Sequence, residues 1–437
     1  MILHEEKIND AITLSAITTD KFKTSLISFS MTIPITKDDY AYNLLLSHML
    51  RRGSKSLPST MLINKRLDEL YGSYIEIKSH RIGENVSLNI TAEVLDNKYI
   101  PDGLDVMGEV IKIASELIFS PAFLSPDFNT DFFEQEKKLI CESIDSEINN
   151  TRVYSAKRCA ELIQINTSAP SSAELRDLIS SATQEGLLAH YKMLISSAPL
   201  KVFCVSANDT EELKQKIATA FEAYPCGKKI DISPIRKISR DDYVEITEKM
   251  PVSQGKLSLA FSTDAFASPD SDESYTMIML NEILGGSATS KLFLNVREKL
   301  GICYYCSSTY SMYSGIILIS SGFEVKNYSV ARKAILKQLE DIKHGKISDS
   351  ELLAAQKSIT NGFRQLYDSP FGLQSFYGNR ELFSIYDDID TSINKLLSVT
   401  KESIVKIAST IELKASFFIE GEADELREED ENDSTDI

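Results

Sequence analysis

An internal repeat is the sequence feature that most constrains the fold of this chain. In each half, an alternating apolar stretch is followed by two amphipathic helices and then by two short strands. When residues 67–80 (LDELYGSYIEIKSH) are set against residues 296–309 (VREKLGICYYCSST), Gly72 falls on Gly301, a shift of 229 residues. A period this long indicates two duplicated domains, because the repeats of solenoids are only about 20–50 residues long.

The order of the predicted elements indicates the fold class. In the first half we expect a strand, two helices and a pair of strands at 26–35, 40–53, 58–72, 73–80 and 86–94, then helices at 104–119, 127–166 and 183–195 and a strand at 201–207. In the second half the repeated elements are expected at 257–263, 274–286, 290–301, 303–313 and 315–325. Neighbouring strands joined by short turns are typical of hairpins. The prediction is therefore an α+β fold, with helices packed on a mainly antiparallel sheet in each domain.

Composition along the chain predicts the domain boundaries. We expect a first domain at 1–223 and a second at 256–420, joined by a linker at 224–255 in which charged residues, proline and glycine collect. The tail at 421–437 is predicted to be disordered. Residues 420–437 contain ten acidic residues and one basic residue, with almost nothing apolar to bury.

The net charge and the cysteines indicate which partners and which cellular compartment to expect. The chain has 47 Lys and Arg against 64 Asp and Glu, a net charge of −17, so we expect neither nucleic-acid nor membrane partners. The first residues lack a basic region followed by an apolar run, and no stretch approaches the roughly 20 apolar residues of a membrane helix. The six cysteines are scattered, which is typical of reduced thiols in a cytoplasmic protein.

Several motifs in a fixed order are characteristic of one family. The helix at 40–53 contains SHML, residues 67–73 read LDELYGS, residues 134–144 read EQEKKLICESI and residues 295–305 read NVREKLGICYY. With these motifs the chain resembles the insulinase (pitrilysin) metallopeptidases, the family of the mitochondrial processing peptidase subunits, over roughly residues 20–420. It looks most like a degenerate bacterial branch associated with the 5-aminopentanol modification of elongation factor P. The resemblance implies two homologous domains that form a clam-shell.

The resemblance identifies a zinc site that this chain has lost. Active members carry His-x-x-Glu-His on a helix, because histidines four residues apart reach one ion and the glutamate can deprotonate the bound water. The matching residues read LLLSH, so Leu44 replaces the first ligand, Ser47 replaces the base and only His48 remains. The distal ligand aligns with Ser143, or with Glu142 if the alignment shifts by one residue. Because fewer than three ligands remain, the resemblance implies no metal, no other cofactor and no autonomous peptidase activity.

The resemblance identifies a second feature that this chain keeps. Active members place an Arg and a Tyr seven residues apart in the second domain, where they bind the substrate backbone and the developing oxyanion. In NVREKLGICYY the matching residues are Arg297 and Tyr304. A guanidinium and a phenol are donors that can polarise a peptide carbonyl. The alternative is that Arg297 pairs with a surface acid such as Glu298 or Glu282, and that Tyr304 is a strand residue with an exposed end.

The loss of the zinc ligands together with the retention of the Arg and Tyr pair favours a role in complex with a second subunit. In heteromeric members of the family, one chain brings the zinc helix and a homologous chain completes the peptide-binding chamber. We therefore expect a catalytically inactive, peptide-binding subunit that forms a heterodimer with a zinc-bearing homologue, or a homodimer, with Arg297 and Tyr304 holding the peptide. The alternative is a scaffold or assembly factor that binds a protein partner and takes no part in a reaction.

Two smaller patterns are interpreted as structural. Cys303 and Cys306 form a C-x-x-C, but positions three apart on a strand are expected to point to opposite faces, which disfavours a redox or metal site. Residues 285–293 (GGSATSKLF) align with the flexible glycine-rich loop of a non-catalytic family subunit. A helix end stabilised by Gly and Ser is the preferred interpretation of that segment.

Overall fold

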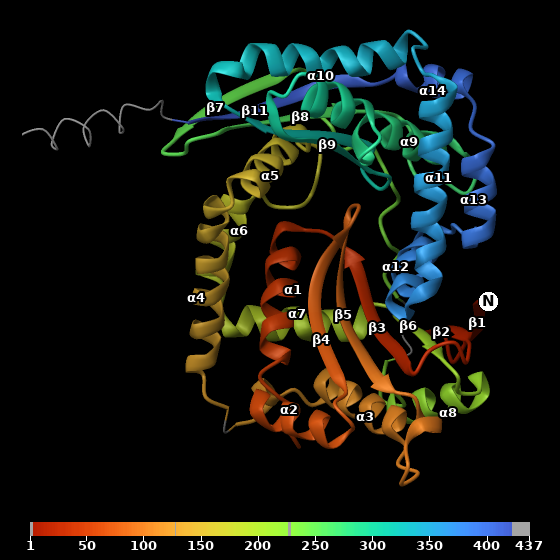
Figure 1. Cartoon of the computed structure of the whole chain (residues 1–437). Helices are drawn as coiled ribbons and strands as arrows, with labels where there is room; N and C mark the ends of the chain where they lie inside the picture. Colours follow the sequence, from red (N-terminus) through yellow and green to blue (C-terminus); the bar gives the residue numbers. More distant parts are fainter. Residues whose placement is uncertain (1–2, 127, 226–228, 422–437) are drawn as a thin grey trace, which may run out of the picture. The chain divides into compact units, whose positions relative to one another are not determined.

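The computed structural model describes residues 3–126, 128–225 and 229–421, which form two compact units (Figure 1). The units interleave along the chain. The first takes its described residues from 1–145, 168–234 and 365–382, and the second from 146–167, 235–364 and 383–437. Each unit holds one sheet with helices packed on it, which confirms the predicted α+β class. Among the described helices, none is long and apolar enough to cross a membrane.

The first unit is built on a six-stranded sheet in the order β1-β2-β6-β3-β5-β4. Its strands are β1 (Leu3–Lys7), β2 (Ile12–Thr18), β3 (Thr24–Pro34), β4 (Tyr74–Ile82), β5 (Asn85–Leu95) and β6 (Leu200–Ser206). β2 pairs with β6 in parallel, and the other neighbours pair antiparallel. The predicted strands at 26–35, 73–80, 86–94 and 201–207 correspond to β3, β4, β5 and β6. β1 and β2 are additional.

Helices pack on the apolar face of this sheet or on the helices that cover it. They are α1 (Lys37–Leu50), α2 (Thr60–Glu69), α3 (Val106–Phe119), α4 (Asp131–Asp145), α6 (Ser172–Ser181), α7 (Gln184–Ser197) and α8 (Thr210–Ala220). Alternation in β3 decides which face they cover, since Phe29 and Met31 enter the main core while Ser28 and Ser30 point to the opposite face. A different helix, α12 (Pro370–Arg380), packs on that polar face against β3 and β6.

The second unit is built on a five-stranded sheet in the order β7-β11-β8-β10-β9. Its strands are β7 (Val244–Met250), β8 (Gly255–Ser262), β9 (Cys303–Ser311), β10 (Ile316–Phe323) and β11 (Glu412–Gly421). One face packs against α9 (Glu273–Asn281), α10 (Tyr328–Lys343) and α14 (Lys401–Ala408), and the other packs against α5 (Thr151–Ile163) (Figure 1). Helices α11 (Asp349–Gln365) and α13 (Ile389–Leu397) complete the unit.

The two sheet-covering helices α5 and α12 are exchanged between the halves of the chain. α5 precedes the predicted linker but belongs to the second unit, whereas α12 follows it but belongs to the first. Sequence periodicity identifies a helix but does not say which sheet it will cover. The predicted linker at 224–255 also contains strand β7, where apolar Val244 and Ile246 alternate with exposed Glu245 and Thr247.

Gly72 and Gly301 support the predicted duplication at the level of backbone geometry. Their φ angles are +71° and +65°, a region that favours glycine. Each glycine ends a helical segment and is followed by an edge strand, β4 after Gly72 and β9 after Gly301. The aligned glycines therefore adopt the same backbone conformation at equivalent turns of the two units.

The helices predicted at 274–286 and 290–301 contain π-helical turns. α9 runs into a π-turn, η4 (Glu282–Gly286), and the next helical segment, η5 (Leu292–Lys299), is π-helical. η4 packs closely on β9, since a Cβ at Gly285 would lie 2.6 Å from the backbone nitrogen of Ser308. Glycine is required at that close approach. The helix ends after Gly286, in agreement with the structural interpretation of GGSATSKLF.

A β-bulge in β9 corrects the prediction that Cys303 and Cys306 point to opposite faces. Cys303 pairs with Phe323 and Tyr305 pairs with Gly322, so Tyr304 is an extra residue without a partner in the register. The extra residue shifts by one position the alternation of side chains between the two faces of the sheet. Both cysteines consequently lie in the same buried core and both face Ser321.

Two predictions fall on residues that the structure does not describe. The disordered tail predicted at 421–437 lies outside the described residues from residue 422 onward, and so does Cys226. The five described cysteines, Cys141, Cys159, Cys204, Cys303 and Cys306, are free thiols.

Candidate functional site

Helix α1 carries the residues that match the zinc motif. It begins after Thr36, whose hydroxyl accepts a hydrogen bond from the backbone nitrogen of Asp39, and two acidic residues in its first turn suit the helix dipole. Leu44 is half-buried and packs against the main core. Ser47 is only 1% exposed, and its hydroxyl donates to the carbonyl of Leu44 at 2.7 Å. Both positions are therefore part of the packing of the helix.

His48 lies in a hydrogen-bonded network with Glu136 of α4 and with Arg52. His48 Nδ1 lies 2.9 Å from Glu136 Oε2, and because a carboxylate only accepts, the imidazole is the donor. Arg52 Nε donates to the other oxygen, Glu136 Oε1, at 2.5 Å, and the guanidinium stacks on Phe132 with 4.5 Å to the ring centroid. Burial disfavours ionisation of Glu136, but the hydrogen bond from His48 and the charge of Arg52 outweigh it, so the pKa of Glu136 is lowered. The carboxylate is held ionised between two donors.

These residues do not fit a catalytic zinc ion. Leu44 offers no lone pair, and the Ser47 hydroxyl is engaged with the backbone. One nitrogen of His48 is used by Glu136, and the guanidinium of Arg52 places a positive charge beside the same carboxylate. No group of three or more His, Cys, Asp or Glu that could hold a metal occurs in the part of the chain that the structure describes.

The structure separates Ser143 and Glu142 from this network. Both are exposed on α4, and Glu142 pairs with Lys138 at 3.6 Å one helical turn away. Glu136, two turns before Ser143, is the residue of α4 that bonds to His48 of the motif helix. This role was not predicted from the sequence. The sequence feature that could have identified Glu136 is its distance of seven residues from Ser143, because residues seven positions apart lie on the same side of a helix.

Arg297 and Tyr304 lie on consecutive elements of the second unit. Arg297 is in the π-helical segment η5, with its side chain 39% exposed, 3.7 Å from Glu298 and stacked on Phe293 with 4.6 Å to the ring centroid. Tyr304 is the bulged residue of β9 and is 54% exposed. Among the described residues no hydrogen bond joins these two side chains. Both side chains are partly exposed, whereas Ser47 is buried and His48, 28% exposed, is hydrogen-bonded to Glu136.

Comparisons of sequence identify related proteins. A family profile described as the peptidase M16 inactive domain matches residues 181–359. The "probable inactive metalloprotease YmfF" of Bacillus subtilis (strain 168) is 28% identical over 416 residues, 94% of this chain and 96% of that protein. The "uncharacterized zinc protease YmxG" of the same organism is 28% identical over 167 residues, 38% of this chain and 40% of that protein.

Comparisons of structure agree with the fold. A conserved protein from Enterococcus faecalis V583 superimposes with a TM-score of 0.83 at 24% identity, over 96% of this chain and 99% of that one. A peptidase M16 inactive domain from Pseudomonas fluorescens gives a TM-score of 0.79 at 14% identity, over 97% of this chain and 99% of that one. In sequence the chain is therefore similar to the peptidase M16 inactive domain and to a probable inactive metalloprotease, and it shares the fold of the M16, or insulinase, metallopeptidases.

Proposed function

We propose that this chain is the peptide-binding, non-catalytic subunit of a cytoplasmic zinc peptidase, in complex with a homologous subunit that carries the zinc helix. The observation that carries the proposal is the contrast between two sets of residues. The zinc-motif residues Ser47 and His48 are engaged in internal hydrogen bonds. The Arg297 side chain is instead 39% exposed, and Tyr304 is 54% exposed. A subunit that binds the peptide but does not cleave it needs only the second set of residues, Arg297 and Tyr304.

The chemistry assigned to this chain is electrostatic. The partner's zinc supplies the activated water. The Arg297 guanidinium and the Tyr304 hydroxyl donate hydrogen bonds to a carbonyl of the bound peptide and to the charge that develops on it. Donors of this kind lower the barrier most where water is excluded. The bulge at Tyr304 fits such a role, because bulges re-aim a side chain at the edge of a sheet.

The test is reconstitution with a zinc-bearing M16 homologue from the same host, followed by cleavage of a fluorogenic peptide. We expect Arg297→Ala to lower kcat/KM of the complex by about 100-fold and Tyr304→Phe by about tenfold. Arg364→Ala and Tyr386→Phe are the matched controls, since both residues are exposed in the same unit and are expected to leave the rate unchanged. Unchanged rates for both Arg297→Ala and Tyr304→Phe, in an intact complex, would show that the pair does not act on peptide.

A scaffold or assembly factor is the second candidate, and one observation favours it. Arg297 already has partners within its own segment, Glu298 and the ring of Phe293. A purely architectural role predicts that the complex forms and that its rate is insensitive to Arg297 and Tyr304. Size-exclusion chromatography with light scattering, run beside the cleavage assay, separates loss of assembly from loss of rate.

A further inference from the structure

Two cations of the second unit lie on one aromatic ring and have no acidic partner. The guanidinium carbon of Arg152, on α5, lies 4.1 Å from the ring centroid of Tyr305, on β9. Lys256 Nζ, on β8, lies 5.7 Å from the same centroid. Within the described part of the chain, neither Arg152 nor Lys256 forms an ion pair. We call these three residues the Arg152 cluster; it lies within one unit and shares no residue with the Arg297 and Tyr304 pair.

The register of the sheet places Tyr305 and Lys256 on either side of a glycine. Gly322 of β10 pairs with Tyr305 in β9 and with Lys256 in β8. The Tyr305 ring lies over Gly322, because a Cβ built on that glycine would overlap the ring. The ring thereby extends across β10 toward Lys256, and glycine is required at this close approach.

Helix α5 brings Arg152 to the same face of the sheet (Figure 1). Ser155, three residues further along the helix, is buried, and its Oγ lies 2.9 Å from Oγ of Ser258 in β8. This contact holds the start of α5 against the strand that carries Lys256. Arg152 itself is exposed, so the cluster can be reached from solvent.

The hydroxyl of Tyr305 is buried and has no hydrogen-bond partner among the described residues. Nearly all buried polar groups in folded proteins are hydrogen-bonded, so this donor requires an explanation. Stacking of Arg152 on an aromatic ring needs the ring alone, which phenylalanine would supply. The hydroxyl therefore indicates a ligand that accepts a hydrogen bond beside the two cations.

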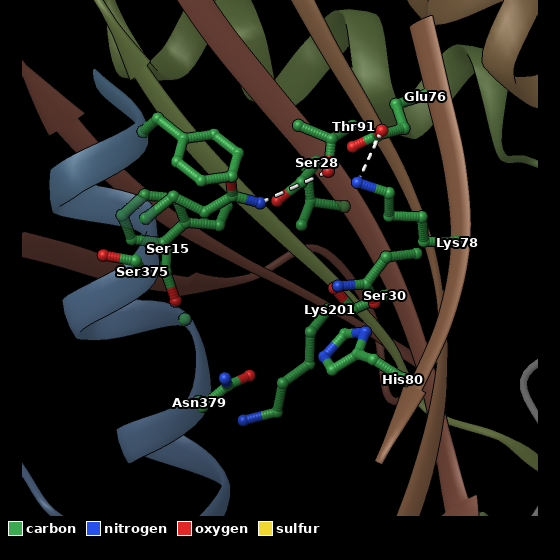
Figure 2. A pocket seen from close by; sticks show the side chains of 16 residues that line it. Ser15, Ser28, Ser30, Glu76, Lys78, His80, Thr91, Lys201, Ser375 and Asn379 are labelled. Atoms are coloured by element: carbon green, nitrogen blue, oxygen red, sulfur yellow. Dashed lines mark hydrogen bonds and ion pairs between the residues drawn. The ribbon is translucent and has the colours of Figure 1, made fainter. Parts of the chain in front are cut away.

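The two cations of the cluster repel each other. Burial and the charge of Arg152 both lower the pKa of Lys256. The Lys256 ammonium has three donors and gives one of them to Gln254 Oε1, at 2.7 Å. By contrast, Lys78 in the polar pocket beneath α12 of the first unit lies 2.6 Å from the carboxylate of Glu76 (Figure 2). Because no carboxylate of the described residues pairs with the Arg152 cluster, the cluster attracts an anion.

We propose that the Arg152 cluster binds the phosphate group of a small ligand, either inorganic phosphate or a phosphate monoester. A phosphate monoester carries a charge of about −1.5 to −2 at pH 7, which matches two cations, whereas a carboxylate would match only one. The planar fork of Arg152 and the ammonium of Lys256 pair with the phosphate oxygens. Arg152 turns away from the ring as it pairs, and the Tyr305 hydroxyl then donates to a further oxygen. The inference does not depend on a partner subunit.

Isothermal titration calorimetry on the full chain, in a buffer without phosphate, tests the proposal with three probes. They are inorganic phosphate, the monoester phenyl phosphate, and dimethyl phosphate, which carries a single negative charge. We expect at least one of the first two probes to bind, and dimethyl phosphate to bind at least about tenfold more weakly. Tighter binding of phenyl phosphate identifies a monoester as the ligand, and tighter binding of inorganic phosphate identifies the free ion.

Variants of the two cations connect the binding to the cluster. Arg152→Met and Lys256→Met are each expected to weaken binding by about tenfold or more. Lys357→Met is the matched control, because Lys357 is an exposed lysine on α11 of the same unit. Circular dichroism confirms that each variant is folded. The proposal is overturned if neither inorganic phosphate nor phenyl phosphate binds the wild-type chain, if dimethyl phosphate binds as tightly as they do, or if both cation variants bind as tightly as the control.

Tyr305→Phe separates a role in binding from a role in folding. This variant keeps the ring that Arg152 stacks on and removes only the hydroxyl. It is expected to weaken binding by about threefold to tenfold, while the midpoint of thermal unfolding stays unchanged or rises, because a buried donor without a partner is removed. If Tyr305→Phe binds as tightly as the wild-type chain, the assignment of the hydroxyl to the site is wrong.

Discussion

Glu136 Oε2 lies 2.9 Å from His48 Nδ1, and this contact joins helix α4 to the helix that carries the zinc motif in active relatives. The carboxylate is almost fully buried and also accepts from Arg52. We therefore expect Glu136→Gln to lower the free energy of unfolding by about 1–3 kcal/mol, since two charge-assisted hydrogen bonds are weakened inside the protein. Urea denaturation measures the change. Glu142→Gln, on the exposed side of the same helix, is the control and should stay within about 0.5 kcal/mol of wild type.

Cys303 and Cys306 should resist alkylation in the folded protein. Both are buried on one face of β9, and burial raises the pKa of Cys306 to about 12 and also raises that of Cys303. A buried thiol with a raised pKa supplies little thiolate to react. In a timed reaction with N-ethylmaleimide, peptide mapping should show the partly exposed Cys141 modified before the pair, which should react only after unfolding. Modification of the pair as fast as Cys141 would contradict the buried position assigned to them.

His80 should make stability depend on pH. Burial lowers the pKa of His80 below its ordinary value of 6.5, so below that pH the unfolded chain binds a proton that the folded chain does not. The free energy of unfolding should therefore fall as pH drops below about 6.5, by at most about 1.4 kcal/mol for each pH unit from this group. Urea titrations between about pH 7.5 and about pH 5.5 should show a smaller fall in His80→Gln. His344→Gln, at an exposed helix end, should keep the wild-type slope.

Gly301 is required for its backbone conformation and not for space. Its φ is +65°, and a Cβ built on it meets nothing within 4 Å. Gly301→Ala should therefore cost about 1–2 kcal/mol of stability, the penalty of a left-handed residue with a side chain. Gly362 offers a matched control, because its Cβ would also meet nothing within 4 Å but its place is inside helix α11. Gly362→Ala should stabilise by about 0.5–1 kcal/mol, and equal effects at both sites would contradict this assignment.

Local periodicity predicted much of this fold. The alternation around Phe29 predicted β3, and the spacing of Ile63 and Leu67 predicted α2. Gly72 and Gly301 predicted the duplication, since a turn with positive φ leaves a glycine in the sequence. These features depend on neighbours within a few residues.

The features that the sequence did not predict depend on contacts over long distances in the chain. The exchange of α5 and α12 between the units depends on which sheet each helix covers, and the pairing of His48 with Glu136 joins residues 88 positions apart. The bulge at Tyr304 follows from pairing with β10. The polar sheet face beneath α12 required the register of four strands, because Lys78 of β4 and Lys201 of β6 lie far apart in sequence. Each polar position alone was indistinguishable from an ordinary exposed strand residue.

A hydrogen-bonded network replaces the zinc ligands on α1. This is tested by the zinc content of the untagged chain, measured by mass spectrometry of the metal after equilibration with zinc and removal of the excess. We expect far less than one zinc per chain, with no change in His48→Ala. One zinc per chain, lost in His48→Ala but kept in a His344→Ala control, would contradict it.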